Sequence, residues 1–405
     1  MMLKITTTNP TPLLQDFQKF MDRLKKEETV LSPKNQYMPK EWLWELNQLV
    51  NFKIEDATPK LDQASYPLLH MFNHLALAGK LAVLIPGKGG RFLLKVSERY
   101  EEYLNLTMTE QYFYLLETLW IDADWGALQK ATHNRIPNEQ IISSIWQEVA
   151  RAEAGKMLSV KDSTSFWHNR LWDWGYFLWY FTYFGFWQFT SDEESLRFSR
   201  RKIEVATLTP TEFGVSIAPV LFQHRDYLEW NHVNLLKDGL RSQESLEEPF
   251  YQAFVSLVEP GELAHTLPRE RQNFVEGTYL FKVSLGRGIW REIEMAAKHT
   301  LDKLHLAIQE AFEFDNDHLY SFFMDNHKGS YDRYESPYDD NGPYADEVTI
   351  GKLGLYTGKI FLYLFDYGDE WEFKVEVEEI NSDKPLPLIP QIMGKRGKAP
   401  DQYGY

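Results

Sequence analysis

The sequence of 405 residues contains no cysteine. This absence excludes disulfide bonds, thiolate nucleophiles, thiolate zinc sites and iron–sulfur clusters. The first residues also lack the apolar stretch that forms a secretory signal. We therefore expect a cytoplasmic protein.

Long apolar runs and an excess of basic residues are absent as well. The most hydrophobic stretch, residues 175–189, is 15 residues long, whereas a membrane-spanning helix needs about 20. Lys and Arg number 43 against 59 Asp and Glu, which gives a net charge of −16. Proteins that bind the phosphate backbone usually carry the opposite balance. We expect no membrane partner, and the acidic charge disfavours nucleic acid.

Apolar residues make up 43% of the chain and aromatic residues 15%, as in globular proteins. The length exceeds one average domain, which favours two or three domains. Apolar residues at steps of three and four predict helices near residues 13–24, 41–50 and 67–79. Residues 80–96 then form two apolar segments around a Gly-rich turn, which predicts a hairpin.

The same order returns later in the chain. An aromatic helix over 171–185 precedes strands 186–190 and 203–208, and a capping box that opens at Thr209 begins the next helix. Helix, hairpin and capped helix is the order of a winged-helix unit. Residues 1–265 are therefore predicted to be mainly helical, with two winged-helix-like units.

Winged helices suggest DNA binding when the helix before the hairpin carries basic side chains. Here the two corresponding helices, 67–79 and 171–185, are apolar and aromatic. The loop of the second hairpin does contain basic residues, but acidic residues precede them, so we favour a solvated loop. The nucleic-acid candidates in that loop are Arg197, Arg200, Arg201 and Lys202.

The C-terminal part alternates strands with one long helix. Residues 278–285 and 289–295 predict a hairpin, Thr300 is placed to cap a helix, 318–324 predicts a strand, and 360–380 predicts a second hairpin. Together these indicate an α+β domain over 277–381, with a mostly antiparallel sheet packed on one main helix. Residues 382–405 are rich in Pro and Gly and are interpreted as a tail.

Four motifs in this part carry a resemblance to a known family: IWREIEM, TLDKLHLAIQEAF, DNDHLYSFFM and LFDYGDEWEF, in that order. Their combination resembles the plasmid pRiA4b ORF-3-like domain family, which is also labelled as mobile-element passenger proteins of resolvase type. The chain departs from the family near its end, where Asp401, Gln402, Tyr403 and Gly404 replace a Glu-Asp pair followed by two glycines. The resemblance implies the α+β fold but no assigned activity. No Ser nucleophile with a neighbouring Arg cluster accompanies the resolvase label.

The family motifs select a set of candidate site residues that has two interpretations. In the functional one, His305, His318, Asp366 and Asp369 converge as a metal or acid–base site. In the structural one, the aspartates fix a turn at Gly368, the histidines satisfy backbone groups and the tryptophans pack on the sheet. We favour the structural interpretation, because the spacing matches no known metal motif, and we expect no cofactor. The full set is Trp290, Arg291, His305, Asp317, His318, Asp366, Asp369 and Trp371.

The loop over 325–347 collects six carboxylates but lacks the residue order of an EF-hand calcium loop. We therefore expect a solvated loop. Its acidic residues are Asp325, Asp332, Asp339, Asp340, Asp346 and Glu347.

Three functions remain open from the sequence. The leading hypothesis is a non-catalytic module that binds another protein or a nucleoprotein through an aromatic N-terminal surface and the C-terminal sheet. The first alternative is a metal-dependent hydrolase or nuclease built on the two histidines and two aspartates. The second is a DNA-binding protein of a mobile element. The sequence favours the non-enzymatic hypothesis without deciding it.

Overall fold

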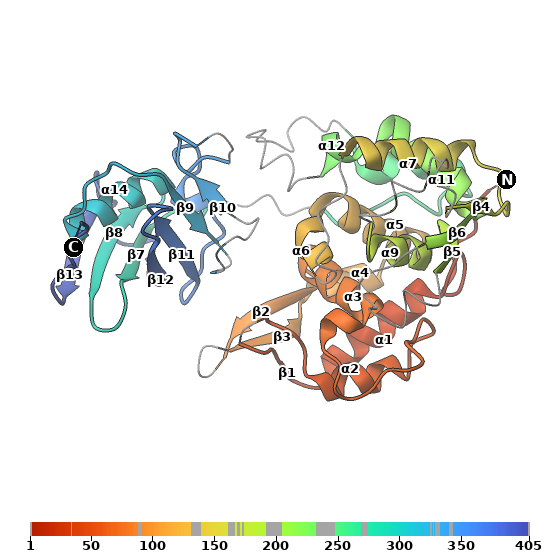
Figure 1. Ribbon diagram of the computed structural model, residues 1–405, viewed down its shortest axis with the longest axis horizontal. Coiled ribbons are helices and arrows are strands. Elements are labelled where there is room, and N and C mark those ends of the chain that lie inside the picture. Colours follow the sequence, from red (N-terminus) through yellow and green to blue (C-terminus); the bar gives the residue numbers. More distant parts are fainter. Residues whose placement is uncertain are drawn as a thin grey trace. The chain divides into compact units, whose positions relative to one another are not determined.

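The structure is a computed structural model of the chain (Figure 1). It describes residues 2–33, 35–87, 91–130, 139–160, 167, 171, 174–191, 205–231, 248–268, 274–324, 326, 328, 333–339 and 343–403. The described residues up to Leu267 form one compact unit and those from Pro268 onward form a second. Helices dominate the first unit and strands the second, which confirms the α+β class. In the described part of the chain, no helix combines the length and apolarity needed to cross a membrane.

The N-terminal unit consists of helices and two small sheets. Its described helices are α1 (Leu13–Lys26), α2 (Lys40–Asn47), α3 (Pro67–Ala78), α4 (Arg99–Leu104), α5 (Met108–Glu117), α6 (Trp125–Lys130), α7 (Glu139–Arg151), α9 (Phe177–Tyr183), α11 (Glu212–His224) and α12 (Tyr227–Trp230). Short helical segments of 3₁₀ or π type include η1 (Gln63–Ser65), η3 (Thr118–Asp122) and η5 (Phe250–Leu257). The strands are β1 (Thr29–Val30), β2 (Ala82–Pro86), β3 (Phe92–Val96), β4 (Leu158–Ser159), β5 (Trp187–Ser191) and β6 (Val205–Pro210).

The two small sheets repeat one pattern. Each contains an antiparallel pair, β2 with β3 or β5 with β6, and a two-residue strand from earlier in the chain. That short strand, β1 or β4, pairs with the later strand of the hairpin, so the orders are β1-β3-β2 and β4-β6-β5. The helices that directly precede the hairpins, α3 and α9, pack against each other.

The aromatic residues of this unit form its core. Tryptophans contributed by distant segments are at most 1% exposed, and the Tyr176 hydroxyl donates a 2.6 Å hydrogen bond to the Ala64 carbonyl. The expectation of an aromatic N-terminal surface for a partner is therefore corrected, because these rings pack against one another inside the unit. The fully buried tryptophans are Trp120, Trp125, Trp146, Trp174 and Trp187.

Helix α11 begins later than the sequence predicts. Thr209 and Pro210 are still part of β6, opposite Gln188 and Trp187. The N-cap is Thr211, whose Oγ1 accepts a 2.9 Å hydrogen bond from the Gly214 amide. Strand pairing thus overrides the capping box expected at Thr209.

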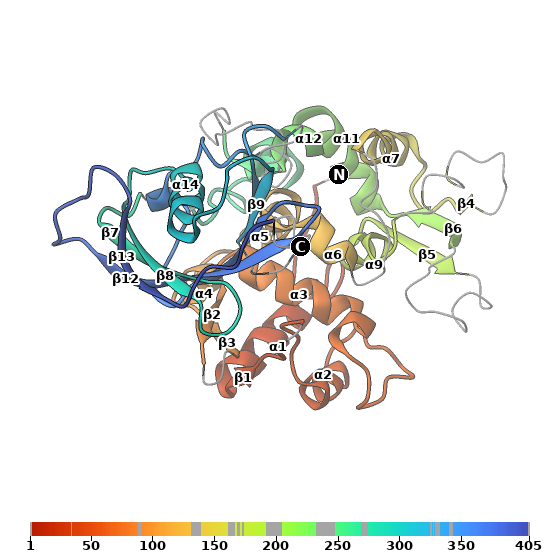
Figure 2. The same cartoon turned by 60° about the vertical axis from the view of Figure 1, so that its left-hand side comes forward.

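In the residues that the structure describes, the C-terminal unit is a seven-stranded antiparallel sheet covered by one helix. Its strands are β7 (Thr278–Ser284), β8 (Trp290–Ala296), β9 (Tyr320–Phe323), β10 (Arg333–Glu335), β11 (Ile360–Phe365), β12 (Trp371–Asn381) and β13 (Gln391–Arg396), in the order β10-β9-β11-β12-β7-β8-β13. Helix α14 (Leu301–Phe312) lies against one face of the sheet, and η6 (Ile350–Lys352) is a short 3₁₀ segment (Figure 2).

The alternation of apolar and polar side chains along the strands explains the core of the C-terminal unit. Tyr279, Phe281 and Val283 of β7 point to the helix side and are fully buried. Leu304 and Ile308 of α14 cover them, and the Thr300 hydroxyl caps the helix by accepting a hydrogen bond from the Lys303 amide at 3.3 Å. Strands β10 and β13 have no counterpart among the predicted elements. Part of the segment interpreted as a tail, 382–405, thus belongs to the sheet.

Candidate functional site

His305 is buried beneath the sheet, where both ring nitrogens are engaged. Its Nδ1 lies 2.6 Å from the Tyr363 hydroxyl and its Nε2 lies 2.7 Å from Asn316 Oδ1. The Gln309 side chain donates to the same hydroxyl at 2.7 Å, and the ring stacks on Tyr320 with centroids 3.8 Å apart. No carboxylate is among these partners.

These contacts define one proton arrangement. The Asn316 oxygen can only accept, so His305 Nε2 carries the proton and Nδ1 accepts from Tyr363. Burial of the imidazole lowers the pKa of His305 to about 4, although the hydrogen bond to Asn316 opposes this shift. The ring is therefore neutral at pH 7 and serves as a relay in a buried hydrogen-bond chain.

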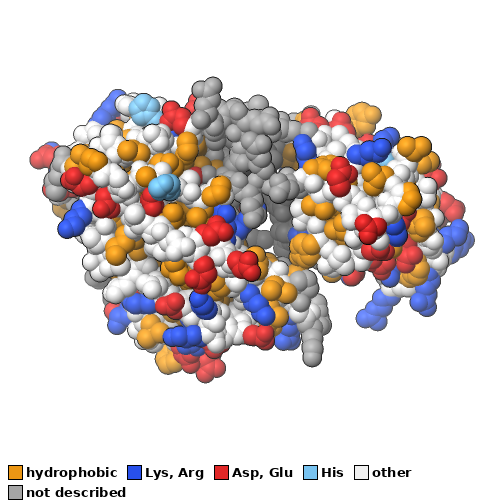
Figure 3. Space-filling model, turned by 180° about the vertical axis from the view of Figure 1, so that it is seen from behind, with side chains coloured by type: hydrophobic (Ala, Val, Ile, Leu, Met, Phe, Trp, Pro, Cys, Tyr) orange, Lys and Arg blue, Asp and Glu red, His pale blue; other side chains and the backbone are white. Residues whose placement is uncertain are grey.

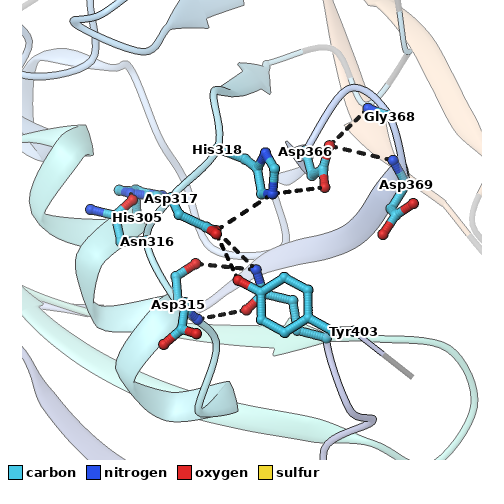
Figure 4. A network of polar contacts seen from close by, with 10 residues as sticks. His305, Asp315, Asn316, Asp317, His318, Asp366, Gly368, Asp369 and Tyr403 are labelled. Atoms are coloured by element: carbon cyan, nitrogen blue, oxygen red, sulfur yellow. Dashed lines mark hydrogen bonds and ion pairs between the residues drawn. The ribbon is translucent and has the colours of Figure 1, made fainter. Parts of the chain in front are cut away.

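His318 lies between two carboxylates at the surface (Figure 4). Its Nε2 is 3.6 Å from Asp317 Oδ1 and 3.4 Å from Asp366 Oδ2. One nitrogen of His318 therefore faces both acids. The contact between His318 and Asp366 connects the start of β9 to the turn that follows β11.

Asp366 and Asp369 belong to that turn. Asp366 has a left-handed backbone conformation with φ of 58°, and its Oδ1 accepts hydrogen bonds from the Gly368 amide at 2.8 Å and the Asp369 amide at 3.4 Å. The Asp366 carbonyl also accepts from the Glu370 amide at 2.7 Å. The Asp366 side chain thus satisfies the backbone of the β11–β12 hairpin turn.

Asp317 also binds the end of the chain. The Tyr403 hydroxyl donates to Asp317 Oδ2 at 2.7 Å, and the Gln402 side-chain amide donates to Oδ1 at 3.2 Å. The hydrogen bond from Tyr403 is the main cause of a lowered pKa at Asp317. Gln402 in turn accepts from the Asp315 amide at 2.6 Å. The sequence showed this segment only as a departure from the family pattern and did not indicate its role.

The remaining candidates also have packing partners. Trp290 lies beside the Lys282 ammonium, 4.9 Å from its ring centroid, and Trp371 packs edge-on against Phe314. Arg291 is buried and donates to carbonyl oxygens, including that of Ala311 at 2.7 Å. The structure thus brings His318, Asp317 and Asp366 together, with the Asp369 backbone amide bonded to Asp366. His305 and both tryptophans have other partners.

The structure describes part of the acidic loop over 325–347. Tyr367 donates to Glu335 Oε2 at 3.1 Å, and Ser321 donates to the same oxygen. Asp339, Asp346 and Glu347 are described, whereas Asp325, Asp332 and Asp340 lie outside the described residues, as do Arg197, Arg200, Arg201 and Lys202. Within the described ranges, no group of three or more His, Asp or Glu side chains has the arrangement of a metal site.

Comparison with known proteins finds a family match in the C-terminal part of the chain. Residues 278–404 match the family model described as Plasmid pRiA4b ORF-3-like protein, which confirms the resemblance seen in the sequence. A crystal structure of a protein of unknown function from Methanosarcina mazei Go1 is 25% identical, with a match that covers 32% of this chain and 74% of that chain and a TM-score of 0.27. No curated protein matches the chain.

Proposed function

We propose that the C-terminal unit, which matches the pRiA4b ORF-3-like family, is a non-catalytic module that binds an extended segment of another protein. The binding surface is the apolar edge, defined as residues 386–393 together with strand β13. The observation that carries the proposal is the exposure of large apolar side chains there: Leu388 is 84%, Ile389 69% and Met393 55% exposed. Clustered apolar exposure of this kind is typical of interaction sites.

Strand geometry makes an extended partner suitable. β13 is the last strand of the sheet order, so one side of its backbone has no strand neighbour among the described residues. An edge strand of this kind can accept a further strand, whose main chain supplies hydrogen bonds while its side chains supply specificity. The apolar edge would then be covered by apolar side chains of the added strand.

Charge defines the partner further. Lys395 and Arg396 at the end of β13 are exposed and form no ion pair within the described residues. A partner segment with acidic residues beside its apolar ones would complement them. We therefore propose an acidic and apolar strand as the ligand.

The polar candidates support a non-catalytic role. His305 is held inside the unit by Tyr363 and Asn316, while Asp366 holds a turn. A general base needs a lone pair directed at substrate, and the lone pair of neutral His305 accepts from Tyr363 instead. The alternative of a metal-dependent hydrolase or nuclease therefore has less support.

We infer that the N-terminal unit contains two winged-helix-like modules. In each, a short strand, a helix and a hairpin follow one another along the chain, and the short strand pairs with the hairpin to complete the small sheet. Direct reading of DNA by α3 or α9 has little support, since these helices pack on each other and most of their residues are buried. Acidic and basic side chains also lie intermingled on the face shown in Figure 3. The charged-loop alternative depends on residues outside the described part.

Site-specific photo-crosslinking tests the interaction. A photoreactive residue at Gln391 should crosslink one discrete protein in cells that express the chain, and the crosslinked segment should be extended, apolar and acidic. The double change Ile389→Asp and Met393→Asp should abolish the crosslink. The matched control Leu49→Asp, at a 57% exposed leucine of the other unit, should retain it.

Two results would contradict the proposal. One is the absence of a crosslink, or a crosslink that both sets of variants leave unchanged. The other is a stoichiometric metal ion in the purified protein that is lost in His318→Ala, which would favour the hydrolase.

A further inference from the structure

Arg291 and Arg225 are the two arginines that are buried in the described part of the chain, and they differ in one respect. Arg225 is 5% exposed and pairs with Glu248 at 3.2 Å. Arg291 is 3% exposed, and no described carboxylate lies within ion-pair distance of it. A buried charge is normally paired, because removal from water is costly. Among the described residues, Arg291 therefore lacks a counter-charge of the kind that Glu248 provides for Arg225.

The guanidinium of Arg291 is held in place by carbonyl groups. Its Nε donates to the Ala311 carbonyl at 2.7 Å, and its Nη1 donates to those of Trp290 at 2.8 Å and Arg396 at 3.0 Å. The Phe312 ring packs on its flat face, with 4.7 Å between the guanidinium carbon and the ring centroid. Its Nη2 forms no hydrogen bond to any described residue, so a fixed cation keeps one terminal nitrogen available.

Arg291 lines an open cleft of about 670 Å³ between the end of α14 and the chain that follows β13. Lys395, Arg396 and Lys398 also line it, and within the described residues none of them forms an ion pair. Three carboxylates, those of Glu313, Asp315 and Asp401, share the cleft. The cations still outnumber the acids here, in a protein whose net charge is −16.

We propose that this cleft binds an oxyanion, a carboxylate or phosphate group of a small molecule, on Arg291. The planar guanidinium is suited to such groups, which accept charge-assisted hydrogen bonds from its terminal nitrogens. Lys395 and Lys398 flank the bound group and add attraction at the mouth of the cleft. The three acids restrict the ligand to one of low charge.

The carbonyl contacts position the Arg291 side chain but do not balance its charge. They orient the side chain and cap the end of α14, where the helix dipole favours a cation. Carbonyl oxygens carry only partial charge, so they do not neutralise the guanidinium. An oxyanion would supply the counter-charge without disturbing any of these hydrogen bonds. The cleft shares Lys395 and Arg396 with the apolar edge, but the anion is held by Arg291, so its binding requires no partner strand.

Side-chain ¹⁵N–¹H spectra of the full chain test this directly. Acetate and inorganic phosphate are titrated separately at constant ionic strength against chloride. The Arg291 guanidinium signals should shift and reach saturation with at least one probe, while those of Arg225 stay in place. Saturation by acetate alone assigns a carboxylate ligand and saturation by phosphate alone assigns a phosphate ligand.

Variants that leave Arg291 intact complete the test. Lys395→Glu with Lys398→Glu should weaken the saturating probe several-fold. The control pair Lys298→Glu with Lys352→Glu, which changes the same charge elsewhere in the unit, should not. If Arg291 signals never saturate, or if both variant pairs weaken binding equally, the proposal is overturned.

Discussion

At the scale of single residues, the polar positions of the C-terminal unit stabilise structure through defined hydrogen bonds. His305 is the clearest case, because its neutral form is fixed between a donor, Tyr363, and an acceptor, Asn316. The sequence indicated that a histidine there was significant. It could not indicate the partners, because Tyr363 lies on a strand far along the chain.

The first prediction concerns pH and His305. The unfolded imidazole binds a proton near pH 6.5, whereas the folded one binds it only near pH 4. Between these values the unfolded state holds more protons, so stability falls as pH falls. From pH 7 to pH 5 this residue should account for a loss of about 2 kcal/mol in the free energy of unfolding.

Urea unfolding of the wild type and of His305→Gln at both pH values measures this loss. The variant should be less stable at pH 7 but should lose less on acidification. An equal loss in both proteins would contradict a neutral, buried His305.

The second prediction concerns the turn at Asp366. Asp366→Ala should destabilise the protein by about 1–3 kcal/mol, because it removes the acceptor for two backbone amides and places Ala in a left-handed conformation. Asp366→Asn keeps an acceptor oxygen and tolerates that conformation, so it should cost less than about 1 kcal/mol. Equilibrium unfolding compares the two, and equal costs would mean that the charge matters more than the turn.

At the scale of elements, helix α14 and strands β7, β8, β9, β11 and β12 follow from local patterns. Apolar spacing, alternation and the Thr300 cap all specify them. β10 was missed because it is only three residues long, and β13 because its residues, which include Gly394, show no regular alternation. Each gains its strand conformation from a neighbour. The start of α11 was misplaced for the same reason, since pairing with β5 keeps Thr209 in a strand.

The third prediction concerns the hydrogen bond by which Gln402, in the chain that follows β13, contacts Asp315. Gln402→Ala leaves the Asp315 amide without its acceptor and should destabilise the unit by about 1 kcal/mol. Amide hydrogen exchange of Lys395 and Arg396 should accelerate. Tyr403→Phe, which removes one exposed hydroxyl contact, should change stability by less than about 0.5 kcal/mol and serves as the control. Unchanged exchange in Gln402→Ala would show that β13 is held by its pairing with β8 alone.

At the scale of the whole molecule, the two large hydrophobic cores of the described residues are separate. One is built on tryptophans that contact one another, and the other on the sheet and α14. Neither core shares a buried residue with the other, and each is large enough to sustain its own unit.

The fourth prediction tests these cores. Trp146→Ala should destabilise the N-terminal unit by about 3–5 kcal/mol and leave hydrogen exchange in β7 unchanged. Phe373→Ala should do the reverse. It should accelerate hydrogen exchange in β7 and leave hydrogen exchange in α5 unchanged. Exchange that rises in both units with either variant would show a single cooperative core.

The contact between α3 and α9 has a consequence for which substitutions this protein tolerates. The two helices occupy equivalent positions, each directly before a hairpin, and they pack against each other. A larger side chain on one helix needs a smaller one on the other, because a packed contact has no room for extra volume. Substitutions at this contact should therefore be tolerated only in compensating pairs.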